Sequence, residues 1–213
     1  MDYSTVQTRV LNRLNMSSDD PSASFVDEYT NEALHMLEIA HPTGWPWMRR
    51  VYTFTTTPGT ASYDFTVISS APVLSTILSV KLLGASSGYA PLTLISPGEA
   101  EQIYPATTSR IPESYYAEGR TLYLYPTPDS AYTVSVRAVI TETDLGGATS
   151  TPVLPVVYHS AWVEQTLLLM YETLQDDAKV EMTQKRLNRW VSDMQKHGRE
   201  YAGAPGVRVR EWL

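Results

Sequence analysis

The chain's four histidines are the side chains best suited to metal binding or proton transfer: His35, His41, His159 and His197. They stand far apart in the sequence and form no HExxH pattern, which would place two imidazoles on one helix face around a zinc ion. We therefore expect ordinary structural roles for them, with no metal site and no cofactor.

Two pairs of adjacent carboxylates could in principle share acid and base roles. They are Asp19 with Asp20, and Asp176 with Asp177. Both pairs lie beside predicted helix starts, where an aspartate side chain accepts hydrogen bonds from the first backbone N–H groups. Helix capping therefore explains them better than general acid–base catalysis.

Sequence patterns of nucleophilic and nucleotide-binding enzymes are absent. The chain contains no GxSxG elbow, no GxxxxGK[ST] loop and no GxGxxG turn. It has no cysteine, which excludes disulfides, thiolate metal sites and cysteine nucleophiles. These observations predict that the protein is not an enzyme.

Aromatic residues form the most distinctive local motif, Trp45-Pro46-Trp47. The two indoles could form a platform for a sugar, or they could wedge a helical region against a β region and fix their angle. The second interpretation is favoured because the motif lies where helical spacing ends.

Tyrosines of the β region, such as Tyr115 and Tyr123, are either ordinary sheet residues or partner contacts. The sequence does not distinguish these two roles.

A short tail after Gly203, Pro205 and Gly206 combines apolar, basic and aromatic residues. Its members are Val207, Arg208, Val209, Arg210, Trp212 and Leu213. An extended segment of this kind can add a strand to an exposed sheet edge while its arginines meet acidic groups. We expect the tail to dock on a partner.

Apolar residues recur with helical spacing near both ends of the chain. The predicted helices span Thr5 to Leu14, Phe25 to Ala40, Val157 to Leu174 and Val180 to Met194. A polar cluster at residues 18–21 is expected to cap the second helix. Each helix has one predominantly apolar face, so the helices are expected to pack on one another.

Between the helices, from about Val51 to Thr143, polar and apolar residues alternate with a period of two. Residues 51–65 predict two strands joined by a turn at Pro58 and Gly59. Further strands are predicted at residues 77–83, 90–95, 114–118, 120–126 and 132–140, with a short helix from Glu99 to Tyr104. Short strands separated by turns indicate an antiparallel sandwich or a small barrel.

The order of helices, strands and helices predicts an α+β fold. Residues 1–47 and 154–201 are expected to form a four-helix bundle. Residues 48–153 would be an inserted antiparallel β-sandwich or barrel, and residues 202–213 an extended C-terminal docking tail.

Charge is unevenly distributed. The formal net charge is −7, yet basic residues outnumber acidic ones from Lys179 onward. Net acidity argues against broad electrostatic binding to nucleic acid, which requires excess Lys and Arg. The asymmetry could steer the acidic face of one subunit toward a basic face of its neighbour, or it could reflect solvated helix faces.

Membrane insertion and export are not expected. No run of about 18 apolar residues occurs. The first residues, MDYSTVQTRV, lack the charged and then apolar pattern of a signal peptide. We therefore expect synthesis and use in a cytoplasm.

The order of several short motifs resembles phage head-to-tail adaptors, or connectors, of the type with a β insertion, as in tail tubular protein A of short-tailed phages. The motifs are Asn31-Glu32-Ala33, Trp45-Pro46-Trp47, Thr57-Pro58-Gly59-Thr60 with Tyr63, the stretch from Leu122 to Asp129, and Leu154-Pro155. The resemblance extends from about Thr5 to Trp190.

The resemblance implies a homo-oligomeric ring, commonly a dodecamer, in the neck of the virion. It implies that the ring lies under the portal protein, that the C-terminal tail docks on the portal, and that a downstream tail or stopper protein binds on the other side. DNA would pass through the channel without sequence readout. The alternative function is a carbohydrate- or protein-binding module of a phage tail, in which Trp45, Trp47 and exposed tyrosines hold the ligand.

Overall fold

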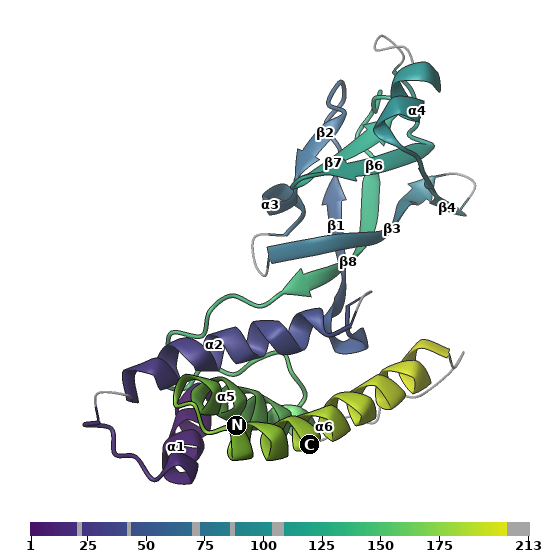
Figure 1. The fold of residues 1–213 in the computed structure, drawn as a ribbon. Coiled ribbons are helices and arrows are strands. Elements are labelled where there is room, and N and C mark those ends of the chain that lie inside the picture. Colours follow the sequence, from purple (N-terminus) through teal and green to yellow (C-terminus); the bar gives the residue numbers. More distant parts are fainter. Residues whose placement is uncertain (21–22, 42–43, 70–72, 86–87, 104–108, 204–213) are drawn as a thin grey trace. The chain divides into compact units, whose positions relative to one another are not determined.

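The structure is a computed structural model that describes residues 1–20, 23–41, 44–69, 73–85, 88–103 and 109–203. The chain forms two compact units (Figure 1). One contains Met1–Met48 and Asp144–Leu213, and the other contains Arg49–Thr143. Residues 144–153, which the sequence places in the β-rich insertion, group with the helices.

Four long helices dominate the first unit: α1 (Tyr3–Leu14), α2 (Ser24–Ile39), α5 (His159–Thr173) and α6 (Asp177–Gly203). Two 3-10 turns, η2 (Pro46–Met48) and η3 (Val156–Tyr158), belong to the same unit. Helix α5 packs against α1, α2 and α6, and most of its side chains are buried (Figure 1). A helix that is buried on all sides lies at the centre of its unit, so α5 positions the other three.

Local capping explains where two of these helices begin. The Asp2 carboxylate accepts the N–H of Thr5 at 2.9 Å and starts α1. The Asp176 carboxylate accepts the N–H of Lys179 at 3.2 Å at the start of α6, which confirms the capping role predicted there. The N-cap residue of α2 is Ala23, which makes no side-chain hydrogen bond, and the polar cluster predicted to cap this helix extends to Pro21, which lies outside the described residues.

The second unit contains two four-stranded sheets. The first has the order β1 (Arg49–Thr55), β8 (Thr133–Thr141), β3 (Val73–Ala85) and β4 (Gly88–Pro91), with antiparallel neighbours. The second has the order β2 (Ser62–Asp64), β7 (Thr121–Tyr125), β6 (Ser114–Glu118) and β5 (Thr93–Leu94). A short helix, α3 (Phe65–Ile68), follows β2.

Strand β5 runs parallel to β6, so the predicted antiparallel arrangement is wrong at this edge. The chain leaves β5 through helix α4 (Pro97–Ile103) before it returns as β6. Parallel neighbours require such a crossover, whereas a tight turn joins only antiparallel strands. The helix itself confirms the short helix expected near Glu99, and Ser96 and Glu99 bond each other's backbone N–H groups as a capping box.

Strands β1 and β2 do not pair with each other, although the sequence predicts a strand, a turn and a second strand there. The chain changes sheets at Thr56, whose N–H donates to the Tyr132 carbonyl at 2.9 Å and whose hydroxyl oxygen accepts the Tyr132 N–H at 2.8 Å. Gly59 has a φ of 78° in the turn, and the Tyr63 hydroxyl donates to the Thr60 carbonyl at 2.8 Å. The turn is therefore held by long-range and side-chain contacts.

The interior of the β unit follows the predicted alternation. Val134, Val136 and Ala138 of β8 are fully buried, as are Leu122 and Leu124 of β7. Because side chains alternate between the faces of a strand, each of these sheets has one apolar face. A sandwich in which the two faces meet stays a prediction, as does a regular four-helix bundle in the first unit.

The chain has a mixed α+β fold, as predicted, with helices before and after a unit of two sheets. Within the described residues, no helix combines the length and the apolar composition needed to cross a bilayer.

Candidate functional site

The two tryptophans of the Trp-Pro-Trp motif stack on each other inside the helical unit. Their ring centroids are 4.9 Å apart, with an angle of 6° between the planes. Trp45 is 1% exposed, and its indole N–H donates to the Leu37 carbonyl at 2.7 Å. The imidazole of His41 lies 4.7 Å from the Trp45 ring. Burial leaves no face of Trp45 for a sugar.

Trp47 extends this stack toward the C-terminal helices. Its ring centroid lies 5.5 Å from that of Tyr158, and the Tyr158 hydroxyl lies 2.5 Å from Nδ1 of His197 on α6. The pair therefore joins the end of α2, η2, η3 and α6 within one unit. Contact of Trp45 and Trp47 with the β unit, the predicted wedge, stays a prediction.

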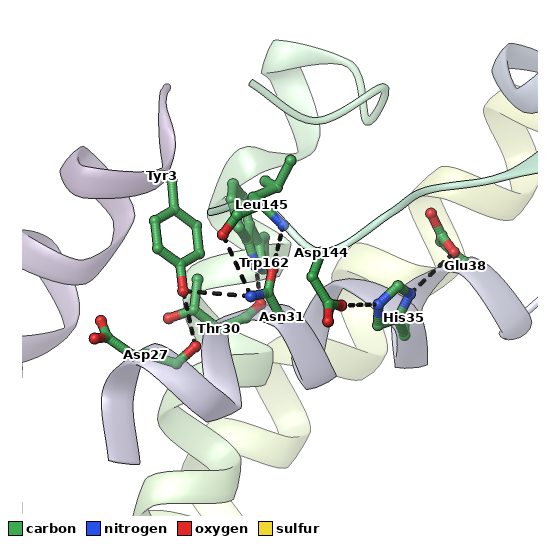
Figure 2. A network of polar contacts seen from close by, with 9 residues as sticks. All are labelled: Tyr3, Asp27, Thr30, Asn31, His35, Glu38, Asp144, Leu145 and Trp162. Atoms are coloured by element: carbon green, nitrogen blue, oxygen red, sulfur yellow. Dashed lines mark hydrogen bonds and ion pairs between the residues drawn. The ribbon is translucent and has the colours of Figure 1, made fainter. Parts of the chain in front are cut away.

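A polar network attaches one face of α2 to the segment that enters the helical unit at Asp144 (Figure 2). The Asn31 side chain accepts the Leu145 N–H at 2.9 Å and donates to its carbonyl at 3.4 Å. His35 lies 2.9 Å from an Asp144 oxygen and 3.4 Å from Glu38. Through Asn31 and His35, one face of α2 thus binds the backbone N–H and carbonyl of Leu145 and the carboxylates of Asp144 and Glu38.

The same network ties α1 and α5 to α2. The Tyr3 hydroxyl donates to the Asp27 carbonyl at 2.8 Å, and Asn31 donates to the Tyr3 hydroxyl at 3.4 Å. The Trp162 indole donates to the Thr30 carbonyl at 2.7 Å (Figure 2). Each aromatic residue brings a polar group into the interior and satisfies it there.

Two histidines in this unit have displaced pKa values. Desolvation lowers the pKa of His35, but hydrogen bonds to Asp144 and Glu38 outweigh it, so its pKa is raised overall. Burial lowers the pKa of His159, whose Nε2 donates to the Leu154 carbonyl at 2.8 Å in the neutral form. Hydrogen bonds thus hold both imidazoles against other segments of the helical unit.

Glu164 of α5 is a carboxylate whose side chain is only 6% exposed. One oxygen lies 2.6 Å from Arg13 of α1, and the other lies 4.0 Å from Arg186 of α6. This ion pair joins three helices. In the part of the chain that the structure describes, no group of three His, Asp or Glu side chains could hold a metal ion.

The C-terminal docking tail lies mostly outside the described residues. Helix α6 continues through Gly203, so the first two residues of the predicted tail are helical. The six proposed docking residues, Val207, Arg208, Val209, Arg210, Trp212 and Leu213, all lie beyond residue 203, where the description ends.

Comparison with known protein families gives one match that covers almost the whole chain. The model described as SU10 adaptor protein matches residues 1–210. The chain belongs to the SU10 adaptor protein family. This membership confirms the resemblance to phage head-to-tail adaptors that the ordered motifs indicate. A search of curated proteins finds no match for this adaptor.

The motifs behind the resemblance have structural tasks in the adaptor. Asn31 binds the backbone of Leu145, and Ala33 is fully buried in α2. Tyr63 holds the turn between the sheets, and the Leu154 carbonyl accepts from His159. These residues define the fold, so the surface that meets partners has to be found elsewhere on the adaptor.

The sequence does not distinguish the exposed apolar residues of α2 from the buried ones. Phe25 and Met36 belong to the predicted apolar face of α2, yet they are 42% and 40% exposed. Ile39, at the end of the helix, is 80% exposed. The apolar arc of α2 is wider than one neighbouring helix covers, and this excess width is the signal in the sequence that could have revealed the surface.

Three tyrosines form a stacked group on the second sheet of the adaptor. The ring of Tyr116 on β6 lies 4.6 Å from that of Tyr123 and 5.7 Å from that of Tyr125, both on β7. All three are half-buried. Desolvation, together with the hydrogen bond to Tyr125, raises the pKa of Tyr116, so the Tyr116 ring stays neutral.

Proposed function

We propose that this chain is a structural, non-enzymatic head-to-tail adaptor whose copies form a ring under the portal. The ring would connect the capsid to the tail in the neck of the virion and leave a channel for DNA. The observation that carries the proposal is the SU10 adaptor family match over residues 1–210, which includes both units.

The helical unit suits the role of a ring subunit. The ion pair of Glu164 and the polar network around Asn31 join the helices, so the unit can act as a rigid body. We infer that α1, α2, α5 and α6 act as a four-helix bundle base, and that the two sheets form a sandwich head for contact with a tail or stopper protein. A subunit count of twelve is the expectation from the resemblance.

The net negative charge of the chain is consistent with DNA passing through the channel without binding tightly to its wall. A net charge of −7 repels phosphates where the channel wall is acidic, so the genome would meet no strong sequence-independent binding site.

Docking on the portal is assigned to the tail from Val207 to Leu213. Deletion of residues 207–213 should abolish binding to purified portal and leave the far-ultraviolet circular dichroism spectrum unchanged. A variant with Arg208 and Arg210 replaced by Lys keeps the charge but loses bidentate hydrogen bonding, so it should bind with intermediate affinity. Full binding by the deletion variant would rule out this docking site.

Electron microscopy of the purified protein mixed with the portal of the same phage tests the proposed function. We expect a closed ring of adaptor density on one end of the portal. A protein that stays monomeric and does not bind the portal would contradict the proposal.

The tyrosine stack favours one alternative, a carbohydrate- or protein-binding role for the β unit in a phage tail. Replacement of Tyr116 and Tyr123 by Ala should then abolish binding to host-surface glycans, measured on a glycan array, without changing assembly on the portal. Loss of ring assembly in this variant would instead place the tyrosines in an adaptor contact.

A further inference from the structure

The outer face of α2 carries apolar and acidic side chains together. Successive residues on a helix lie about 100° apart around its axis, so the residues opposite the buried set can be identified from their positions. The outer face consists of Phe25, Glu28, Tyr29, Glu32, Met36 and Ile39. At the edge of this face, the Tyr29 hydroxyl accepts a hydrogen bond from Thr173 and the Met36 sulfur accepts one from Gln165, both on α5. Phe25 stacks on Tyr29 with ring centroids 6.0 Å apart, so the two rings form one aromatic patch on this face.

The rest of the α2 surface contacts other parts of the same chain. Its buried face packs on α5, and its polar flank binds the segment at Asp144 and Leu145 through His35 and Asn31. Ser24–Ile39 contains four carboxylates and no Lys or Arg. Asp27 bonds Gln7 and Glu38 bonds His35, which leaves the two carboxylates of the outer face, and neither has a partner among the described contacts.

The outer face of α6 has the opposite charge. It presents Met182, Lys185, Arg189, Asp193 and Lys196, all exposed and aligned along the helix, so basic residues are in excess on this face. Lys185 pairs with Glu181 and Lys196 pairs with Asp193, whereas Arg189 between them has no partner among the described contacts. A basic stripe with one exposed methionine matches the chemistry of the α2 outer face.

Helix α5 separates these two faces. Trp162 of α5 donates to the Thr30 carbonyl of α2, while Glu164 of α5 approaches Arg186 of α6. Positions two residues apart lie about 200° apart around a helix. Helices α2 and α6 therefore pack on opposite sides of α5, and their outer faces are separate surfaces of the helical unit.

We propose that the outer face of α2 in one copy of this chain binds the outer face of α6 in the next copy. This contact rests on the proposed ring and names the surfaces that form it. Glu28 and Glu32 would meet Arg189 and its neighbours, while Met36 and Ile39 would bury apolar area against Met182. Contact between two α2 faces is disfavoured because it would bring their glutamates together.

Two different, separate faces of a subunit give a heterologous, head-to-tail contact. Such contacts close into a ring when the rotation between copies permits, whereas a self-complementary face stops at a dimer. The surfaces of α2 and α6 therefore provide the type of contact that a ring needs.

Charge reversal with complementation tests the contact. Glu32→Arg and Arg189→Glu should each raise the protein concentration needed for ring assembly on the portal of the same phage, by about tenfold or more. An equal mixture of the two variants should restore assembly, because the reversed α2 face of one meets the reversed α6 face of the other. Glu101→Arg and Arg110→Glu, exposed changes of the same charge in the β unit, are the matched controls.

Cysteine cross-linking gives an independent measurement. The chain has no cysteine, so Glu32→Cys in one preparation and Arg189→Cys in another introduce the only thiols. Mild oxidation of the mixture on the portal should give a disulfide-linked pair of chains. A mixture of Glu101→Cys and Arg189→Cys should give no such pair.

The outcomes separate this contact from the adaptor function itself. Wild-type rings together with unaffected reversal variants and no cross-link would overturn the contact and leave the adaptor function intact. Impaired single variants that the mixture does not rescue would also overturn the contact. Absence of wild-type rings on the portal would overturn both proposals.

Discussion

Trp45 and Glu164 each bring a polar group into the interior of the helical unit, and each finds a partner there. The Trp45 indole binds the Leu37 carbonyl, and Glu164 binds Arg13. An unpaired buried polar group lowers the stability of the folded state, so the stability of this unit depends on these partners. Both are structural residues of the adaptor.

Replacement of Trp45 by Ala should lower the free energy of unfolding by about 3–5 kcal/mol, because it removes a buried ring and its hydrogen bond. Trp47→Ala should cost less, since Trp47 is only half-buried. Urea unfolding followed by circular dichroism measures both changes. Equal and small effects would show that Trp45 does not support the core.

The ion pair of Glu164 should show an asymmetry between its partners. Arg13→Met leaves a buried carboxylate without its close partner and should cost about 2–3 kcal/mol, whereas Glu164→Gln should cost about 1 kcal/mol because Arg13 is half-exposed and can bind water. The double variant should be more stable than Arg13→Met alone. A double-mutant cycle by urea unfolding checks this order, and additive costs would contradict it.

At the scale of elements, the surface of α2 has three parts. Its buried face packs on α5, its polar flank holds the segment at Asp144, and its outer face remains exposed. Helical periodicity predicted the helix correctly. It did not predict which apolar residues are buried, because that depends on where α5 and residues 144–145 lie.

The contact of His35 with Asp144 and Glu38 should make stability depend on pH. A raised pKa means that the folded state favours the protonated imidazole, so this contribution is present below the ordinary pKa of about 6.5 and is lost as pH rises through the raised value. The His35→Gln variant should not show this loss of stability as pH rises. Urea unfolding at a series of pH values from about 6 to 8 measures the difference between the two proteins.

The difference between wild type and His35→Gln isolates this group from His159. The pKa of His159 is lowered by burial, so its own effect is a loss of stability as pH falls below about 6.5. An identical pH dependence in wild type and His35→Gln would show that the α2 contact is not coupled to protonation.

At the scale of the whole molecule, the β unit is an insertion with its own core. It enters at β1 and leaves after β8, and these strands are neighbours with Arg49 opposite Val139. The two ends of the unit therefore lie close together, as expected for a domain inserted into another.

Residues 49–143 expressed alone should fold cooperatively, because the buried residues of both sheets lie within this range. Thermal unfolding and a dispersed proton NMR spectrum would measure this. Leu122→Asp in the same fragment places a charge at a fully buried position and should abolish the transition. A fragment that is unfolded without the substitution would show that the sheets need the helices.

The amino-acid sequence by itself determined the α+β class, the helices at both ends and the strands between them, because these follow from local periodicity and spacing. The tertiary structure decided which strands pair, since β1 and β2 find partners far along the chain in different sheets. It also decided which side chains of α2 are exposed. Burial depends on all the neighbours of a residue, and those neighbours come from distant parts of the sequence.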